Sequence, residues 1–542
     1  MRTADYFDYV QNSFHARGWS AYCQVSLCIH SLIDVLSRAY WQILLALFLG
    51  LSGILLQTRY RRGLRNLPGP FLASISSLPR VVTAFGGHQF LKHAEYHKTY
   101  GPMVRVGPNH VSIADSQCIS QIYSITSKFY KSNFYILFDA DTGTAKVPTV
   151  FSVRDQSMHK SMKRPIANAY SMSSMIELEP AANACTEIFE RKLQEKQGAP
   201  IDLGAWLHWY AFDLITSITF SNRLGFMEKE TDVDDIIDSI EGRLAYNSVV
   251  GQAPWLHNLL LGNRLFKSIG TRFKAVAKLN TAQYIVKFAA EQLLRYNNSE
   301  KPKEIRDMLS RFKTMQDGES LISDNQLLAH AASNIFAGSD TTAISLRAII
   351  YYLCRNPTCY EKVLAEIDGM DSRGEFSNPV TFTEVSKMTY YHACMKEAMR
   401  LHPSCGQMLE RVVPEGGATL AGTFLPQGTI VGVNPWVIGR DKAVYGENAN
   451  DFVPERWLYN DAVSLKAMER NFFAFGAGSR SCLGKNVSLM EMSKLVPQLL
   501  RNFHFELENP DVEWKLTGYW FVKQTGLICR VNQRKQLLSF SS

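Results

Sequence analysis

The chain of 542 residues lacks a strong compositional bias, and this excludes several classes of protein. With 46% hydrophobic and 20% charged residues, it is neither a disordered, highly charged chain nor a fibrous one. It contains no internal repeat and no low-complexity block. Ten cysteines are too few for a disulfide scaffold, and they form no CxxC pair and no Cys/His cluster with zinc spacing. We therefore expect a large core that contains mostly reduced cysteines.

The overall excess of charge of one sign is small. The net charge is +8, from 58 Lys and Arg against 50 Asp and Glu. No Lys/Arg-rich block is interleaved with aromatic residues, so we expect no nucleic-acid partner. The mild positive balance instead favours an anionic membrane surface or an acidic protein partner.

Long apolar runs are rare, and the exception lies near the N-terminus. Residues 39–58 carry no charge and, as a helix with a rise of 1.5 Å per residue, can just span a bilayer core of about 30 Å. We predict a single transmembrane anchor there, although a buried core helix has a similar sequence. Residues 1–38 contain equal numbers of Arg and Asp, whereas four arginines follow the run: Arg59, Arg61, Arg62 and Arg65. The positive-inside rule then predicts a lumenal segment 1–38 and a cytosolic catalytic domain.

The rest of the chain has the pattern of a helix-rich domain with a smaller β region. Residues 59–70 form a basic connector that ends in Leu67-Pro68-Gly69-Pro70, a stiff non-helical segment. Residues 102–115 and 417–433 have strand and turn chemistry, whereas about 155–400 is mostly of helical period. We find no domain boundary after the connector, and we predict one α+β domain over 71–535.

A long central helix is predicted from Ser323 to Arg355. It begins with a capping box at Ser323-Asp324-Asn325-Gln326 and stops at Asn356-Pro357. Such a mostly apolar helix runs through the middle of a large protein. Its centre, residues 337–342 (AGSDTT), holds a glycine, an acid and two threonines, which are poor choices for a buried helix. The segment marks either a functional site or a helix bend with internally satisfied polar groups.

The most informative segment is residues 471–490 (NFFAFGAGSRSCLGKNVSLM). It contains the pattern Phe475-x-x-Gly478-x-x-x-Cys482-x-Gly484, followed by a helical sequence. We expect a tight loop at a helix N-terminus, where backbone N–H groups stabilise a thiolate and glycines allow a flat macrocycle to approach. Phe475 can shield the sulfur, and Arg480 can donate to a carboxylate. Although a cysteine is usually an inert core residue, this combination rarely occurs by chance.

These residues resemble the cytochrome P450 family, the haem-thiolate monooxygenases, and the matches extend from about residue 67 to 530. The resemblance implies the P450 fold and haem b, with Cys482 as the axial ligand of the iron and Arg480 on a haem propionate. It further implies that Arg411, in Leu409-Glu410-Arg411, binds a propionate. His159 and Lys163 stand where the family often has a haem-binding Trp-x-x-x-Arg. Both can donate to a propionate and are further candidates for haem binding, although they depart from the common pattern and also suit a solvated helix face.

Two further motifs agree with this resemblance. Glu397 and Arg400 have the i,i+3 spacing that lets an acid and a base pair on one helix face. Arg456 lies in Phe452-x-Pro454-Glu455-Arg456-Trp457, which matches the family's second arginine motif. An ExxR alone is a weak signal, because helical surface pairs are common. The resemblance implies that the two arginines and Glu397 form a buried ion network that supports the haem.

The resemblance also implies a function for the centre of the long helix. Its glycine would open a groove over the haem, and the acid–alcohol pair Asp340 and Thr341 would guide protons to dioxygen (O2). No flavin or nicotinamide fingerprint is present in this chain. Electrons would therefore come from NADPH through a separate NADPH-cytochrome P450 reductase on the endoplasmic reticulum membrane, with cytochrome b5 as a further candidate donor.

The strings FYKSNFY (129–135), ANAYSMSSM (167–175) and YWFVKQTG (519–526) resemble filamentous-fungal, pisatin-demethylase-like members, which act in secondary metabolism and defence-compound turnover. We expect a medium-sized apolar substrate. Candidate contacts are the loop 133–150, the segment 246–260, Phe336, Ala337, Met408 and Trp520. Two alternatives stay open: an isomerase or dehydratase with this fold that needs no external electrons, and a non-enzymatic haem sensor. The intact Asp340-Thr341 pair favours the monooxygenase.

Overall fold

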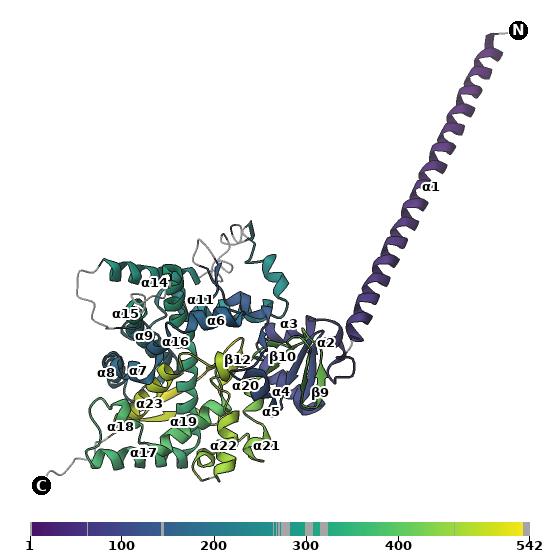
Figure 1. Cartoon of the computed structure of the whole chain (residues 1–542). Helices are drawn as coiled ribbons and strands as arrows, with labels where there is room; N and C mark the ends of the chain where they lie inside the picture. The colour runs from purple at the N-terminus through teal and green to yellow at the C-terminus, as the bar shows by residue number, and fades with distance from the viewer. Residues whose placement is uncertain are drawn as a thin grey trace. The chain divides into compact units, whose positions relative to one another are not determined.

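The computed structural model describes residues 3–534, apart from 62, 142–145, 264, 267, 269–271, 273–281, 299–306, 315–322 and 460. The chain divides into two units, Met1–Arg65 and Asn66–Ser542 (Figure 1). Part of the predicted substrate loop, residues 142–145, lies outside the described residues, as does Arg62 of the basic flank.

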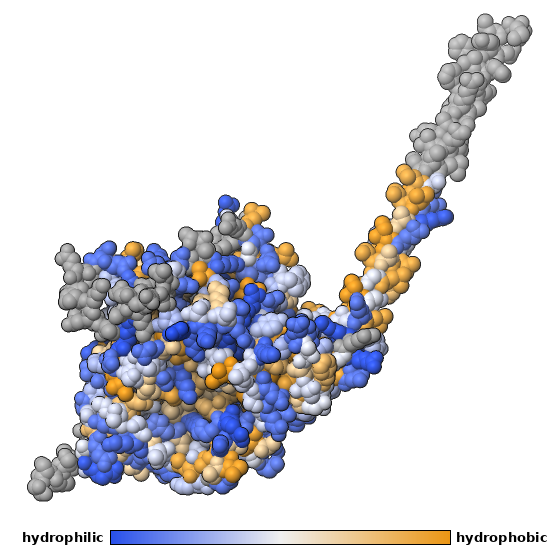
Figure 2. All heavy atoms as spheres, viewed as in Figure 1, coloured by the Kyte–Doolittle hydropathy of each residue, from blue (hydrophilic) through white to orange (hydrophobic). Residues whose placement is uncertain are grey.

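The first unit is dominated by one helix, α1 (Thr3–Arg59). Its His30–Arg59 part is long and apolar enough to cross a membrane. The large side chains there are exposed, and Figure 2 shows mainly apolar residues along the described part of this helix. The helix continues through the region predicted as a lumenal segment, so the span is set by hydropathy and not by a helix end.

Helices make up most of the second unit. They are α2 (Phe71–Ile75), α3 (Leu78–Phe85), α4 (Gln89–Tyr100), α5 (Gln117–Tyr123), α6 (Gln156–Lys163), α7 (Met172–Glu177), α8 (Glu179–Glu195), α9 (Leu203–Phe220), α10 (Phe226–Lys229), α11 (Ile236–Val250), α14 (Ala282–Asn297), α15 (Met308–Thr314), α16 (Asp324–Arg355), α17 (Pro357–Ser372), α18 (Phe382–Val385), α19 (Thr389–Leu401), α20 (Pro435–Ile438), α21 (Lys442–Tyr445), α22 (Ala462–Asn471) and α23 (Lys485–Asn502). The predicted mainly α fold with a smaller β region is confirmed.

The strands form one mixed sheet and several small antiparallel sheets. The mixed sheet has the order β1-β2-β10-β7-β3, in which β2 and β10 are parallel and the other neighbours antiparallel. Its strands are β1 (Met103–Gly107), β2 (His110–Ile113), β10 (Ile430–Val433), β7 (Arg411–Val412) and β3 (Tyr130–Lys131). In one small sheet β14 (Ile528–Gln533) lies between β11 (Phe503–Leu507) and β6 (Pro200–Asp202). The others pair β12 (Lys515–Gly518) with β13 (Val522–Thr525), β4 (Ala140–Asp141) with β5 (Lys146–Val147), and β8 (Ala418–Leu420) with β9 (Thr423–Leu425).

Helix α16 is the central element, as the sequence predicts. The capping box is present, because the Ser323 side chain accepts from the Gln326 backbone and the Gln326 side chain accepts from Ser323. The helix packs against α9, α14, α19 and α23. At Gly338 an added Cβ would lie 2.8 Å from Cδ1 of Ile215 in α9. The glycine therefore allows the close crossing of these two helices.

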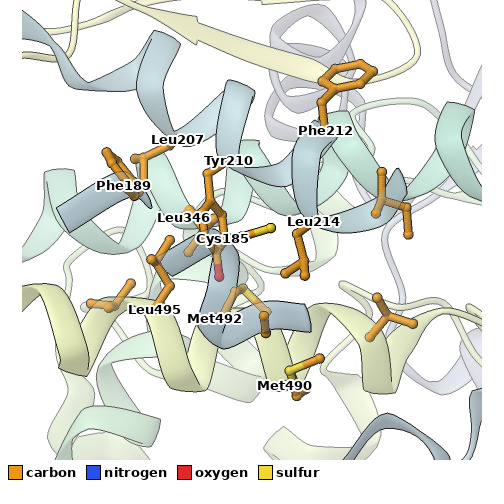
Figure 3. Close-up of a cluster of buried hydrophobic side chains, with 14 of the residues drawn as sticks. Cys185, Phe189, Leu207, Tyr210, Phe212, Leu214, Leu346, Met490, Met492 and Leu495 are labelled. Carbon is orange, nitrogen blue, oxygen red and sulfur yellow. The ribbon is translucent and has the colours of Figure 1, made fainter. Parts of the chain in front are cut away.

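The core fills the space between α8, α9, α16 and α23. Figure 3 shows side chains from all four helices pointing toward one another, among them Phe189, Tyr210, Leu346 and Met492. All four are at most 1% exposed. Because the core holds α23 against α16, it fixes the loop that precedes α23.

The connector ends in a backbone contact with the mixed sheet. The N–H of Arg105 in β1 donates to the carbonyl of Pro68 at 2.8 Å. Gly69 has φ +153, and an added Cβ would lie 2.4 Å from the carbonyl oxygen of Arg105. The Leu67–Pro70 segment is non-helical and is held against β1, and α2 begins directly after it.

Candidate functional site

The loop around Cys482 is closed by backbone hydrogen bonds and leads into α23. The N–H of Cys482 donates to the carbonyl of Phe475 at 2.9 Å, and that of Gly476 donates to Phe473 at 3.0 Å. The backbone N–H of Gly484, the N-cap of α23, donates to the Cys482 sulfur. The structure therefore has the tight loop at a helix N-terminus that the sequence predicts.

Two positions of this loop differ in whether the protein itself requires a glycine there. Gly478 has φ +63, and an added Cβ would lie 1.6 Å from the carbonyl oxygen of Tyr123 at the end of α5. No larger residue fits there. At Gly484 an added Cβ would meet no protein atom within 4 Å. The chain itself does not require this glycine, whereas the close approach of a flat macrocycle would.

Cys482 faces an internal cavity. Of the cysteines whose side chains the structure describes, it alone has an exposed side chain, whereas Cys118, Cys185, Cys359, Cys394 and Cys529 are buried. The surrounding protein nevertheless raises the pKa of the Cys482 thiol, because a thiolate is poorly solvated there. The N–H of Gly484 and the ammonium groups of Lys485 and Lys163 act in the opposite direction.

The cavity has a volume of about 370 Å³ and is lined by residues from many parts of the second unit. Thr341, Phe336, Ala337 and Gly338 of α16 line it, as do Phe475, Cys482 and Gly484 of the loop. Aromatic side chains form part of its wall: the ring of Trp520 lies 5.4 Å from that of Phe138 and 5.9 Å from that of Phe151. Of the predicted substrate contacts, Phe336, Ala337, Trp520 and parts of the 133–150 loop line the cavity.

A cluster of basic side chains lies on one side of this cavity. Arg411, Arg480, Lys163 and His159, all expected near the propionates, line it. So does Lys131 of β3, which the sequence analysis did not single out; it stands in the FYKSNFY string. Burial and the neighbouring cations lower the pKa of His159 to about 3 and that of Arg480 to about 10. The same causes lower the pKa of Lys131 well below its ordinary value.

Among the described residues, the lysine and arginine side chains of this cluster donate hydrogen bonds to carbonyl or hydroxyl oxygens and to no carboxylate, although the Asp155 carboxylate is near enough to raise the pKa of Arg480. Arg480 donates to the carbonyl of Val153 at 2.7 Å, Lys163 to that of Ser479 at 3.1 Å and Arg411 to that of Glu410 at 2.8 Å. Among the described residues that line the cavity, the one carboxylate is Asp139, which accepts from Ser152 at 2.6 Å. Buried cations need counter-charges. The donor set therefore fits the two carboxylates of haem, next to a thiol that can bind its iron.

The structure brings Glu397, Arg400 and Arg456 together in a fully buried network. The Glu397 carboxylate accepts from Nε and Nη2 of Arg400, both at 2.8 Å, and from Nε of Arg456 at 2.8 Å. It also accepts from Nε1 of Trp457 at 2.9 Å and from the backbone of Val453 at 3.0 Å. Trp457 is a member that the sequence analysis missed, although its motif was recognised. The guanidinium groups donate in addition to backbone carbonyls, including those of Gly439, Ala449, Tyr445 and Asn448.

The acid and the alcohol of α16 face different surroundings. Thr341 lines the cavity, and its hydroxyl donates to the carbonyl of Ala337 at 2.8 Å. Asp340 does not line it; its Oδ1 lies 2.5 Å from Nε2 of His208 in α9, and both residues are at most 5% exposed. Burial lowers the pKa of His208, while the contact with Asp340 acts to raise it. The sequence analysis missed His208, because α9 carries no motif that identifies it.

One predicted substrate contact is wrong. Met408 is buried away from the cavity, where its side chain fills the space next to Gly432 in β10. Of the 246–260 segment, Asn247 lines the cavity. These positions depend on how the strand and the helix pack, which no local motif specifies.

Comparisons with known proteins agree with a haem site in the second unit. The family model described as Cytochrome P450 matches residues 67–528. The cytochrome P450 monooxygenase cicH of Emericella nidulans is 37% identical over 88% of this chain and 95% of its own length. The cytochrome P450 monooxygenase gsfF of Penicillium aethiopicum is 34% identical, over 91% of this chain and 98% of its own. A cytochrome P450 monooxygenase of Aspergillus terreus is 36% identical over 81% and 90%.

Proposed function

The chain belongs to the cytochrome P450 family, whose members use haem iron and dioxygen, and we propose that it is a membrane-anchored monooxygenase. Its reaction inserts one oxygen atom into a medium-sized, mostly apolar substrate, in secondary metabolite biosynthesis or defence-compound turnover. The observation that carries the proposal is the position of Cys482: its sulfur faces the same cavity as a cluster of basic side chains that, among the described residues, hydrogen-bond to no carboxylate.

Cys482 would bind the haem iron, and Arg411, Arg480, Lys131, His159 and Lys163 would hold the propionates. When bound, haem activates dioxygen with electrons from outside the protein, and thiolate donation assists that activation. The chain supplies the position, the electrostatics and the exclusion of water. The hydrogen bond from Gly484 would stabilise the thiolate form of Cys482.

Thr341 and Asp340 would divide the handling of protons. The Thr341 hydroxyl faces the cavity, where it can pass a proton to the reacting oxygen. Asp340 does not line the cavity and lies against His208, so it would influence proton transfer without touching substrate. The hydroxyls of Ser345 and Ser404 donate to the carbonyl of Thr341, both at 3.0 Å, and hold this turn of α16 in place.

Membrane attachment is supported by two regions of the chain. The His30–Arg59 part of α1 has the length and hydropathy of a span, and basic residues follow it. Helices α2 and α3, which follow the connector, expose several large apolar side chains: Phe71, Leu72, Leu78, Val82 and Phe85. Exposed apolar patches of this kind mark contact surfaces. We place the protein in the endoplasmic reticulum membrane with the catalytic unit in the cytosol.

Electrons would come from NADPH through a membrane-bound cytochrome P450 reductase, and cytochrome b5 is a candidate second donor. The chain carries no flavin or nicotinamide fingerprint of its own. A net charge of +8 suits acidic partners of this type. The family generally works with a separate redox partner, which supports this choice.

The proposal is tested in microsomes that contain this protein and a matching reductase. They are supplied with host metabolite extract under isotopically labelled dioxygen, with and without NADPH, and the products are compared by mass spectrometry. We expect an NADPH-dependent product that gains one labelled oxygen. An isomer or a dehydrated product that forms without NADPH would establish the alternative isomerase or dehydratase, which the placement of Asp340 away from the cavity keeps in consideration.

A further inference from the structure

Three hydroxyl groups form one corner of the cavity, at the turn of α16 that carries Thr341. Thr341 and Ser345 lie on successive turns of this helix, Ser404 follows α19, and all three residues line the cavity. The hydroxyl oxygens of Ser345 and Ser404 are 3.3 Å apart. Although this turn lies inside the protein, Thr341 and Ser404 are only partly buried, because they border the cavity.

The corner lies at the reacting end of the cavity. Thr342, the next residue of α16, contacts Ser488 of α23, with 2.9 Å between the two hydroxyl oxygens. Helix α23 begins directly after the loop that contains Cys482. A substrate group that touches the three hydroxyl groups is therefore close to the atom that is oxidised beside Thr341.

The proton of each hydroxyl group in the corner already has an acceptor in the protein. Thr341 donates to the carbonyl of Ala337 at 2.8 Å. Ser345 and Ser404 both donate to the carbonyl of Thr341 at 3.0 Å. By contrast, no described residue outside the corner donates a hydrogen bond to any of the three hydroxyl oxygens. The three hydroxyl groups therefore offer the cavity acceptor sites and no spare donor.

The neighbouring polar side chains are directed elsewhere. The hydroxyl oxygen of Ser488 contacts Thr342, which does not line the cavity, and the thiol of Cys405 donates to the carbonyl of Gln407 at 3.9 Å. The other polar residues of α16 that line the cavity stand at least seven positions before Thr341: His330, Ser333 and Asn334. Beside Thr341, the polar side-chain surface is thus that of the three hydroxyl oxygens.

This arrangement favours a hydrogen-bond donor on the ligand over an acceptor. A ligand carbonyl or ether oxygen can be bound only if one hydroxyl group rotates away from its present carbonyl, so one hydrogen bond forms and another breaks. A ligand N–H or O–H group donates to a hydroxyl oxygen without breaking any bond of the protein. The net free energy of one hydrogen bond is therefore available to the donor alone.

On the basis of the proposed function, we propose that the substrate carries an N–H or O–H group close to the oxidised position and donates it to the hydroxyl oxygens of Ser345 and Ser404. Ser345 is four residues after Thr341, which corresponds to about 6 Å along the helix axis. The donor group thus lies a few bonds from the atom that reacts. The two serines select a phenol, an alcohol or an N–H heterocycle over the ketone, ether or hydrocarbon of the same size.

The experiment uses the full-length, haem-loaded enzyme in its oxidised form and four tricyclic probes of nearly equal size. Carbazole has an N–H group where fluorene has a CH₂ group, dibenzofuran an ether oxygen and fluorenone a carbonyl. The carbazole nitrogen does not bind iron, because its lone pair is part of the aromatic system. Binding is followed by the shift of the haem absorption band, without reductase or turnover.

We expect carbazole to bind roughly fivefold more tightly than fluorene, which is the gain from one hydrogen bond. Dibenzofuran and fluorenone should bind no more tightly than fluorene. Equal affinities for carbazole and fluorene, or tightest binding of fluorenone, would overturn the inference.

Variants assign the preference to the two serines. The ratio of the carbazole and fluorene affinities should fall in Ser345→Ala and in Ser404→Ala and approach one in the double variant. Ser404→Thr keeps the hydroxyl group and should retain the preference, which separates the loss of the acceptor from a folding defect. Ser333→Ala is the matched control: Ser333 lines the cavity on the same helix, eight residues and about 12 Å before Thr341, and its loss should leave the ratio unchanged. An unchanged ratio in the double variant would overturn the inference.

The outcome is separable from that of the proposed function. A preference for carbazole that depends on the two serines, combined with no NADPH-dependent oxygenation in the microsomes, would refute the monooxygenase and leave the substrate inference standing. Oxygenation of a host metabolite that has no N–H or O–H group would refute the inference and leave the monooxygenase standing.

Discussion

Replacing Glu397 by glutamine should destabilise the protein severely. The carboxylate is fully buried and accepts five hydrogen bonds, three of them from two guanidinium groups. Glutamine removes the counter-charge of Arg400 and Arg456 and turns an NH₂ group toward their donors. Removing one partner of a buried ion pair costs about 3–5 kcal/mol. Because domains are stable by only about 5–15 kcal/mol, we expect the loss of a large part of that stability.

The effect is measured as the urea midpoint of unfolding and as the yield of haem-loaded protein per amount of membrane. The matched control is Glu375→Gln, because Glu375 forms an exposed pair with Arg373 at 2.7 Å that solvent screens. We expect a much lower midpoint and yield for Glu397→Gln and almost no change for Glu375→Gln. If both variants behaved like the wild type, the network would not support the fold in the way its contacts indicate.

Three further predictions follow from single contacts. Gly478→Ala should abolish haem loading, because φ is +63 and the new Cβ would collide with the Tyr123 carbonyl; Gly198→Ala, with φ +78 but open space, should fold, and loading in both would refute the steric argument. His208→Leu leaves the Asp340 carboxylate buried without its partner, so we expect more of the NADPH consumed to be lost as peroxide and a changed solvent isotope effect; unchanged coupling would remove Asp340 from proton handling. Burial raises the pKa of Glu491 well above its ordinary value, so the folded protein keeps a proton that the unfolded chain releases above about pH 4.3. The stability of the wild type should therefore fall relative to Glu491→Gln as the pH rises from 5 to 8, and a constant difference in urea midpoint would contradict this.

The ends of the central helix and the first two strands could be predicted from the sequence, because caps, prolines and alternating apolar residues are local patterns. The capping box at Ser323 and the stop at Asn356-Pro357 predict the ends of α16 to within a residue. The alternating pattern of residues 102–115 predicts β1 and β2. The order of the mixed sheet was not accessible, because β2 pairs with β10 from a distant part of the chain and nothing local specifies that partner.

Some residues of the candidate site could likewise be predicted from local motifs, whereas others depend on contacts between distant parts of the chain. The Cys482 loop, Arg480 and the Glu397–Arg400 pair lie within short motifs, and residue types at fixed spacing were enough to place them. The pair of His208 and Asp340 joins residues 132 positions apart, and His208 looks like an ordinary helical residue until α9 packs on α16. Met408 failed for the converse reason: its place after the Glu397–Arg400 helix does not decide which way its side chain points, and the packing against Gly432 does.

The central claim is that Cys482 binds the haem iron as a thiolate, and the absorption spectrum of the reduced, carbon monoxide-bound enzyme tests it most directly. We predict that the wild type shows the strongly red-shifted Soret band of a haem with a trans thiolate. Cys482→His should move this band to the shorter wavelength of an imidazole-ligated haem. A red-shifted band that persists in the variant would show that another residue is the ligand and would contradict the account.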